Sequence, residues 1–222
     1  MNNLKYTQEE LQRLATQLGC PSGSVGVDVG LNMEVSNMSM IKNTIQELHP
    51  QHLDHILELG FGNGAHIPSL LKQQKSITYK GLEISETMRT EAQKINKSWI
   101  QNQRASLHAY DGIHIPFQDN SFNKIFTVNT IYFWKNPAAL IAELYRVLKK
   151  GGVLAITYAH KEFMLQLPFT KYGFTLYDTP KILRLIKNIP FKNIDICCYT
   201  EQVKSKIGTM VNRDYSLVLL QK

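Results

Sequence analysis

Apolar and polar positions alternate along most of the chain in a way that predicts short strands separated by helices. Residues 55–59 are apolar enough for a buried strand, and four further runs of the same kind follow at 78–84, 105–110, 124–129 and 153–158. Helical patterns separate most of these runs. Strands and helices that alternate in this way predict a parallel sheet with helices on both faces.

Helical periodicity dominates the N-terminal stretch. Leu11, Leu14 and Leu18 share one helical face, and Gly19 ends that helix. A second apolar stripe covers residues 38–48 after a glycine-rich stretch. We therefore expect two helices before the first strand, joined by a connection that includes residues 33–40.

The C-terminal end departs from this alternation. Residues 194–200 and 215–220 read as strands, and no helical segment of useful length separates them. Two strands joined without a crossover helix should pair antiparallel. The expected sheet is therefore mostly parallel and ends in an antiparallel hairpin.

Composition limits where the chain works. Of its 222 residues 43% are hydrophobic, which suffices for one continuous core. Apolar runs such as 153–156 are far too short to cross a bilayer, and the first residues lack the apolar stretch of a secretory signal. We expect a cytoplasmic protein without a membrane span. Cys20, Cys197 and Cys198 give neither a disulfide framework nor paired metal-ligand spacing, so no metal is expected.

The positive charge is concentrated near the C-terminus. The formal net charge is +7, and residues 151–222 carry +5 of it, with 10 Lys and Arg against 5 Asp and Glu. These cations are scattered, which is typical of a solvated surface and predicts no nucleic-acid partner. They also hint at an anionic substrate.

The first segment with chemical content is a glycine loop, residues 60–64, directly after the first strand. Glycines let a backbone approach a ligand closely. Glu83 ends the second strand, where an acid can accept hydrogen bonds from ribose hydroxyls. The glycine spacing with Ala65 also fits the G-x-G-x-x-G/A pattern of NAD-binding folds. A tight turn and a surface glutamate are the plainer alternatives.

The second segment follows the third strand. Asp111 and Gly112 come first, and residues 115–123 then lead into the fourth strand. A carboxylate at this strand end can accept a hydrogen bond from an adenine amino group. The alternative is an ordinary turn, because Asp-Gly and Asp-Asn-Ser are common turn sequences.

Three segments together resemble class I S-adenosylmethionine (SAM)-dependent methyltransferases. Residues 56–64 (ILELGFGNG) resemble their first motif, residues 116–122 (PFQDNSF) their P-F-x-D-x-S-F signature, and residues 143–152 (ELYRVLKKGG) their E-x-x-R-V-L-K-P-G-G stretch. The resemblance covers roughly residues 50–160. The nearest subgroup, the type 11 group, contains the ubiquinone/menaquinone-biosynthesis C-methyltransferases. Phe61, Asn123 and Lys150 depart from the pattern and weaken assignment to any one subfamily.

The resemblance implies an α/β fold: a Rossmann-like, doubly wound, seven-stranded sheet, mostly parallel with an antiparallel C-terminal strand and helices on both faces. It implies one domain over 1–222, with an N-terminal helical cap at 1–50, a SAM-binding core at 51–160, and a substrate lid with the terminal antiparallel strands at 161–222. The cofactor is SAM, and the product is S-adenosylhomocysteine.

The same resemblance assigns cofactor contacts. The glycine loop and Glu58 before it match the loop that wraps the methionine part of SAM. Glu83 matches the acid that binds the ribose hydroxyls, and Asp111 matches the acceptor for the adenine amino group. Asn129 matches the position near the methyl group. The full expected set is Glu58, Gly60, Gly62, Gly64, Glu83, Ile84, Asp111, Gly112 and Asn129.

The sulfonium of SAM already makes its methyl group electrophilic, so the protein must mainly hold a nucleophile in line and exclude water. A base is needed only if the nucleophile must lose a proton. His114 and His160 are candidates by type, and residues 132–134 could stabilise a cation through their rings or simply pack. We name His160 and Tyr132 as the catalytic candidates.

Two segments should cover the site: residues 33–40, and the aromatic-rich stretch 163–177, a plausible lid. The expected acceptor is a small or medium organic molecule with an apolar part. Its candidate contacts are Met33, Asn37, Trp134 and Tyr158.

Three rival functions compete with this interpretation, and for the third, a nucleic-acid methyltransferase, the sequence rules out only one type. An NAD-dependent oxidoreductase is disfavoured by Gly64, the Asp111 segment and the terminal strand pair. A non-catalytic SAM-binding protein has the same sequence signals. A nucleic-acid methyltransferase of the base-flipping, amino-methylating type is excluded, because residues 129–132 read Asn-Thr-Ile-Tyr where such enzymes carry Asp/Asn-Pro-Pro-aromatic. The sequence leaves the methylated atom and the oligomeric state open.

Overall fold

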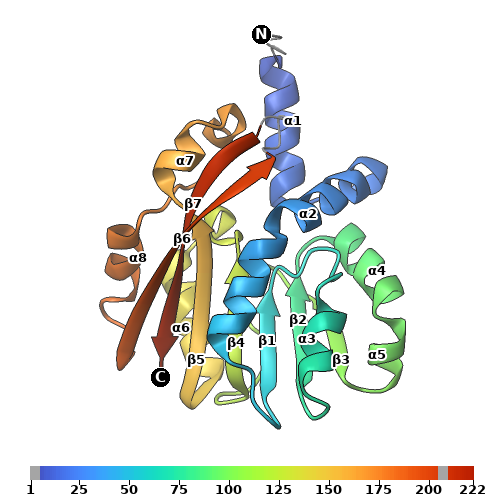
Figure 1. Ribbon diagram of the computed structural model, residues 1–222, viewed down its shortest axis with the longest axis vertical. Coiled ribbons are helices and arrows are strands. Elements are labelled where there is room, and N and C mark those ends of the chain that lie inside the picture. The colour runs from blue at the N-terminus through green and yellow to red at the C-terminus, as the bar shows by residue number, and fades with distance from the viewer. Residues whose placement is uncertain (1–5, 205–209) are drawn as a thin grey trace.

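The computed structural model describes residues 6–204 and 210–222, which form one seven-stranded sheet in the order β3-β2-β1-β4-β5-β7-β6 (Figure 1). β7 runs antiparallel to both of its neighbours, and the other pairs are parallel. The predicted sheet is therefore confirmed. The strands are β1 His55–Leu59, β2 Thr78–Glu83, β3 Ala105–Ala109, β4 Phe122–Val128, β5 Leu148–Ala159, β6 Asn193–Lys204 and β7 Met210–Gln221.

The order of the strands creates one natural place for a ligand. The chain runs outward from β1 to β2 and β3, and then returns to place β4 on the other side of β1. Where strand order reverses in this way, the loops after the two central strands diverge and leave a crevice beyond their carboxyl ends. Here these loops follow β1 and β4.

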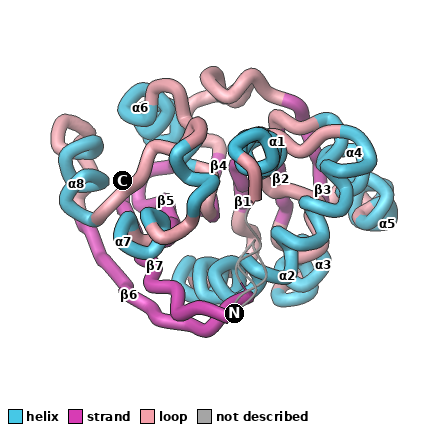
Figure 2. The backbone as a smooth tube through the Cα atoms, turned by 90° about the horizontal axis from the view of Figure 1, so that it is seen from above, coloured by secondary structure: helices cyan, strands magenta, loops and turns pink. Residues whose placement is uncertain are grey.

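Helices cover both faces of the sheet. Figure 2 shows α2 and α3 on one side and α6 on the other. The helices are α1 Gln8–Gly19, α2 Gly23–Leu48, α3 Ile67–Gln73, α4 Glu86–Ile95, α5 Lys97–Gln101, α6 Pro137–Val147, α7 Lys161–Leu165 and α8 Thr179–Ile186, with 3-10 turns η1 Ile131–Phe133 and η2 Pro168–Lys171.

Two helices begin at residues whose side chains cap them. The Ser85 hydroxyl accepts a hydrogen bond from the backbone N–H of Met88 at 3.1 Å and opens α4. The side chain of Asn136 accepts one from the backbone N–H of Ala139 at 3.2 Å and opens α6 with Pro137 at its first position. Each cap satisfies a donor that the first helical turn leaves without a partner.

The prediction that residues 33–40 connect two helices is wrong. These residues lie inside α2, one continuous helix from Gly23 to Leu48. In the sequence the glycines suggest a break between two helices, but in the structure they allow close packing. A Cβ at Gly26 would meet the Pro21 carbonyl carbon at 2.7 Å, and one at Gly30 would meet the sulfur of Met88 at 2.6 Å. Glycine here costs some helix propensity but lets α2 lie close to its neighbours.

Two other helices end at clear structural boundaries. α6 ends at Val147, because Leu148 is already extended and pairs with Phe122 of β4. α4 ends at Ile95, and Asn96 follows it and precedes α5.

Candidate active site

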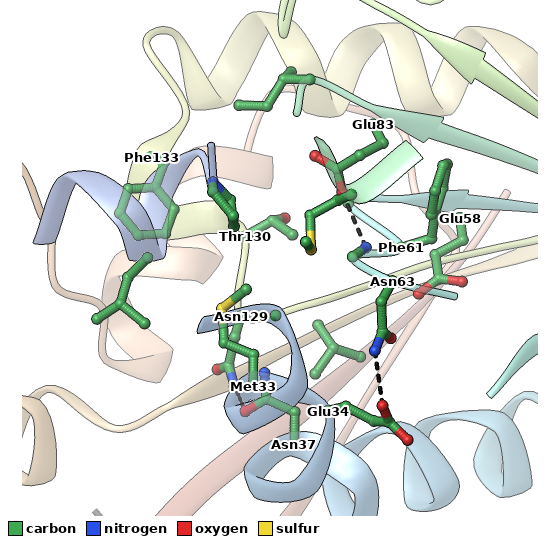
Figure 3. Close-up of a pocket in the computed structure, with 18 of the residues that line it drawn as sticks. Met33, Glu34, Asn37, Glu58, Phe61, Asn63, Glu83, Asn129, Thr130 and Phe133 are labelled. Atoms are coloured by element: carbon green, nitrogen blue, oxygen red, sulfur yellow. Dashed lines mark hydrogen bonds between the residues drawn. The ribbon is translucent and has the colours of Figure 1, made fainter. Parts of the chain in front are cut away.

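The main functional feature is a cavity, here called the main cavity, beyond the carboxyl ends of β1, β2 and β4 and against α2 (Figure 3). It lies where the strand order predicts a ligand. Ten of the residues expected from the sequence line it: Met33, Asn37, Glu58, Gly60, Gly62, Glu83, Ile84, Gly112, Asn129 and Trp134.

The glycine loop forms the floor of this cavity with backbone that only glycine adopts without strain. Gly60, Gly62 and Gly64 have φ values of 73°, 57° and 65°. Gly62 has no atom within 4 Å of where a Cβ would lie, so its backbone faces open cavity. Gly64 does not line the cavity, and its Cβ would meet Ile67, Ala92 and Asn96. Gly62 therefore leaves room for a ligand, whereas Gly64 permits packing.

Phe61, one departure from the family pattern, has a structural explanation. Its side chain is 3% exposed and lies against Gly81 of β2. A Cβ at Gly81 would come within 2.8 Å of ring atom Cε1 of Phe61. A glycine in β2 thus accommodates the large residue in the loop.

Glu83 joins two strand ends. Its Oε2 accepts a hydrogen bond from the backbone N–H of Gly62 at 3.0 Å, and its Oε1 accepts one from the backbone N–H of Ser85 at 2.9 Å. Each oxygen keeps capacity for a second hydrogen bond. Burial raises the pKa of Glu83 above its ordinary value, although these backbone hydrogen bonds act in the opposite direction. The carboxylate can therefore accept from two neighbouring hydroxyls at once.

Glu58 is a buried acid held by two side chains that the sequence analysis did not single out. Its Oε2 accepts from the Tyr79 hydroxyl at 2.6 Å and lies 2.7 Å from Nε2 of His66. Glu58 itself is 2% exposed. A buried carboxyl group requires such partners, and Tyr79 and His66 supply them to Glu58 beneath the glycine loop.

A third carboxylate comes from α2, the helix beside the glycine loop. Oε2 of Glu34 on α2 accepts a hydrogen bond from Nδ2 of Asn63 at 2.7 Å, which ties the helix to the glycine loop (Figure 3). The cavity is thus lined by the acids Glu34, Glu58 and Glu83, and no lysine or arginine of the described residues lines it. Three carboxylates suit a cationic ligand and disfavour the pyrophosphate of a dinucleotide.

Asn129, after β4, has a φ of 58°, an uncommon conformation for a residue other than glycine. Its Oδ1 accepts from the Tyr132 hydroxyl at 2.8 Å, and its Nδ2 donates to Oδ1 of Asn37 at 3.1 Å. The Tyr132 hydroxyl in turn accepts from the backbone N–H of Ala159 at 2.6 Å. These contacts fix the orientation of the Asn129 amide.

Asp111 lies beside the main cavity but does not line it. Its exposed carboxylate accepts from the backbone N–H groups of Ile113 and His114, each at 2.8 Å, and lies 2.6 Å from Nδ1 of His114. These hydrogen bonds hold the pKa of Asp111 well below its ordinary value. Its neighbours Tyr110 and Gly112 line the cavity instead.

Tyr158 and His160 line neither the main cavity nor the second cavity beside it. The structure therefore does not place Tyr158 at an acceptor or His160 as a base. The Tyr158 hydroxyl lies 3.0 Å from Oγ1 of Thr179 in α8, and Nε2 of His160 lies 2.6 Å from Oγ of Ser216. Side chains alternate between the two faces of a strand. Ala159, between them, therefore faces a cavity while they face the other side.

The second cavity, here called the aromatic chamber, adjoins the main cavity. Its walls come from α2, η1, the segment 163–174 and the hairpin of β6 and β7. The predicted lid segment is thus a packed wall, with Phe163 and Phe169 buried. The two cavities share Leu18, Met33, Asn37, Asn129 and Phe133.

Comparison with known proteins agrees with this geometry. Residues 57–156 match the family model described as a methyltransferase domain. These residues, a little under half of the chain, thus form a SAM-dependent methyltransferase domain. No comparison supports the NAD-dependent oxidoreductase, which the acidic lining also disfavours. Every helix in the described part of this methyltransferase is too short or too polar to span a bilayer.

Similar proteins include the uncharacterized methyltransferase YdaC of Bacillus subtilis, 29% identical over 134 residues, which are 60% of this chain and 71% of that protein. Demethylmenaquinone methyltransferase of Lactiplantibacillus plantarum is 30% identical over 115 residues, 51% of this methyltransferase and 48% of the relative. The chain thus spans about half the length of this second relative.

A solved structure shares the fold. It is phosphoethanolamine N-methyltransferase 2 of Haemonchus contortus in complex with phosphomonomethylethanolamine and S-adenosylhomocysteine. The TM-score is 0.69 at 15% identity, over 88% of this methyltransferase and 57% of that chain.

Proposed function

We propose that this methyltransferase binds SAM in the main cavity and moves its methyl group, by direct in-line transfer, to a small or medium organic acceptor in the aromatic chamber. The observation that carries this proposal is the shared wall of the two cavities. Met33, Asn37 and Asn129 belong to both linings. Two molecules bound on either side of these residues would meet there.

The main cavity fits the chemical groups of SAM. The two free acceptor positions of Glu83 suit the paired hydroxyls of a ribose, and the open face of Gly62 leaves room for the chain beside it. Ile84, Tyr110 and Gly112 line the part near β2 and β3, which suits an adenine. Glu34 and Glu58 supply negative charge near the glycine loop. When bound, SAM supplies a methyl group made electrophilic by a sulfonium.

The chain's own residues orient the acceptor and exclude water. The Tyr132 hydroxyl is committed to Asn129 and to the backbone of Ala159, and burial raises its pKa. It therefore stays protonated near neutral pH and acts as a positioning group rather than as a base. The five shared residues, Leu18, Met33, Asn37, Asn129 and Phe133, are amides or apolar. Rate enhancement then comes mainly from proximity and desolvation.

A non-catalytic SAM-binding protein is the second candidate, since it needs only the main cavity. The adjoining aromatic chamber favours the enzyme. The cytoplasmic location and the division into a cap, a core and a lid stay predictions of the sequence.

Calorimetric binding of SAM, S-adenosylhomocysteine and NADH to the wild-type protein and to Glu83→Ala tests the cofactor assignment. We expect SAM and S-adenosylhomocysteine to bind, and the substitution to weaken both about ten- to a hundredfold, because it removes a charged hydrogen-bonding group worth about 1.5–3 kcal/mol. Binding of NADH alone, or equal affinities in both proteins, would refute it. Tight SAM binding without turnover on any acceptor pool would favour the non-catalytic alternative.

A further inference from the structure

Charge is divided between the two cavities. Glu34, Glu58 and Glu83 line the main cavity, whereas the charged side chains among the described residues that line the aromatic chamber are Lys204 and Arg213. The charge of Arg213 is paired with Glu201, so among the described residues Lys204 supplies the unpaired cation of this lining, and an unpaired cation attracts an anionic ligand. The chamber therefore favours a ligand with negative charge, whereas the main cavity favours one with positive charge.

The cationic side of the chamber is a built wall. Arg213 is 5% exposed, and its guanidinium donates to Oε1 of Glu201 and, at 2.6 Å, to the backbone carbonyl of Ser36 on α2. This fixes the guanidinium against the chamber. Lys204 lies on the same hairpin, is exposed, and forms no salt bridge with a described carboxylate. Its charge is available to a ligand.

The opposite walls suit a flat apolar body. Phe174 packs against three aromatic rings, with centroid distances of 4.6 Å to Phe133, 5.8 Å to Phe169 and 5.9 Å to Tyr132. Aromatic faces and edges at such spacings favour a planar guest. Met33 and Met164 complete an adaptable surface.

One polar group faces the junction of the cavities. Because Oδ1 of Asn129 accepts from Tyr132, its Nδ2 must donate to Oδ1 of Asn37. The Asn37 amide is thereby oriented, and no described residue accepts a hydrogen bond from its Nδ2. Nδ2 of Asn37 is a donor presented where the two linings meet.

We propose that the aromatic chamber binds a flat, apolar carboxylate that also carries an oxygen able to accept a hydrogen bond. The carboxylate lies toward Lys204 and Arg213, the rings lie against Phe174, and the oxygen lies against Nδ2 of Asn37. This inference rests on the proposed function, whose acceptor it specifies. Asn37 is then the residue that places the acceptor atom at the junction.

The test uses three matched probes: 4-hydroxycinnamate, its amide 4-hydroxycinnamamide, and cinnamate without the hydroxyl. Each is titrated calorimetrically into the protein, with and without saturating S-adenosylhomocysteine. We expect the carboxylate to bind at least about tenfold more tightly than the amide, the usual effect of one charge-assisted contact. We also expect 4-hydroxycinnamate to bind more tightly than cinnamate.

Two variants assign these preferences. Lys204→Gln should remove most of the preference for the carboxylate and leave S-adenosylhomocysteine affinity unchanged, whereas Asn37→Leu should abolish the preference for the hydroxyl. Lys150→Gln is the control, since Lys150 is an exposed lysine near the amino end of β5, far from the junction. It should change neither preference.

The outcomes separate this inference from the proposed function. If S-adenosylhomocysteine binds but the carboxylate is not preferred, or the preference survives Lys204→Gln, the inference is overturned and the proposed function stands. Failure of all three probes to bind overturns it in the same way. Failure of S-adenosylhomocysteine to bind contradicts the proposed function, and the titrations without it still decide the chamber's preference.

Discussion

Oε2 of Glu83 accepts a hydrogen bond from the backbone N–H of Gly62 at 3.0 Å, so the acid that ends β2 holds the loop that follows β1. The two residues are 21 positions apart, one in the loop after β1 and the other at the end of β2, which is the parallel neighbour of β1. The loop and the acid are therefore one structural unit, and a change in the charge of Glu83 acts on both.

The affinity for S-adenosylhomocysteine should fall as the pH is lowered. The fall should occur at a higher pH than it would if Glu83 had the pKa of an ordinary glutamate. Burial raises the pKa of Glu83, and the protonated acid loses an acceptor for a ribose hydroxyl. The ionised form, present above that pKa, is the one that binds. Calorimetry between pH 4 and 8 measures the profile. The Glu83→Gln variant should bind S-adenosylhomocysteine weakly, and its affinity should depend little on pH. If its pH profile equals that of the wild type, Glu83 is not the group that titrates.

Gly62→Ala and Gly64→Ala should separate binding from folding. Both residues have positive φ, so each substitution strains the backbone by about 1–2 kcal/mol. At Gly62 the new methyl enters open cavity, so we expect an additional loss of S-adenosylhomocysteine affinity. At Gly64 it would come within 2.9 Å of Ile67, so we expect the larger loss of stability.

Urea unfolding and calorimetry on both glycine variants measure the two effects. The outcome that rules out this division is a Gly62→Ala protein that binds as tightly as the wild type.

Tyr79→Phe should destabilise the fold by about 1–3 kcal/mol, because it leaves the buried Glu58 carboxylate with one partner fewer. The matched control is Tyr145→Phe, whose hydroxyl makes only a long, exposed contact of 3.5 Å with the carbonyl of Pro190. That change should stay within about 0.5 kcal/mol. Equal urea midpoints for the two variants would show that the Tyr79 hydroxyl contributes no stability.

Arg213→Met should cost about 3–5 kcal/mol of stability, because it leaves Glu201 without its partner in a mostly buried ion pair. Replacing both residues, Arg213→Met with Glu201→Met, should recover much of this loss. Thermal unfolding of the single and double variants forms the cycle that measures it. A double variant less stable than Arg213→Met would show that the loss does not come from an unpaired Glu201.

The sequence predicts the sheet well because each strand is a short apolar run bounded by turn residues, a local signal. It predicts α2 poorly because Gly26 and Gly30 resemble a break in any local pattern. Only tertiary contact shows why they are glycine: Pro21 and Met88 lie too close for a side chain. Long-range packing of this kind leaves no trace in helical periodicity.

The site divides in the same way. The loop glycines and Glu83 are recognisable because they follow strands at a fixed spacing. Tyr158 lies in β5 and His160 follows it, but both face away from the chamber, and one residue of register decides this. Arg213 is not predicted as a lining residue, because β7 brings it to the chamber from far away in the sequence. Glu34 lies in the segment 33–40 that is expected to cover the site, but the sequence does not single it out.

The shared partition between the two cavities has a thermodynamic consequence. Met33, Asn37 and Phe133 each contact both spaces, so whichever ligand arrives first orders part of the surface that the second must use. Linkage then requires reciprocity: the factor by which S-adenosylhomocysteine changes the affinity for an acceptor analogue equals the factor by which the analogue changes the affinity for S-adenosylhomocysteine. A wall only one side chain thick thus makes the two occupancies one coupled equilibrium.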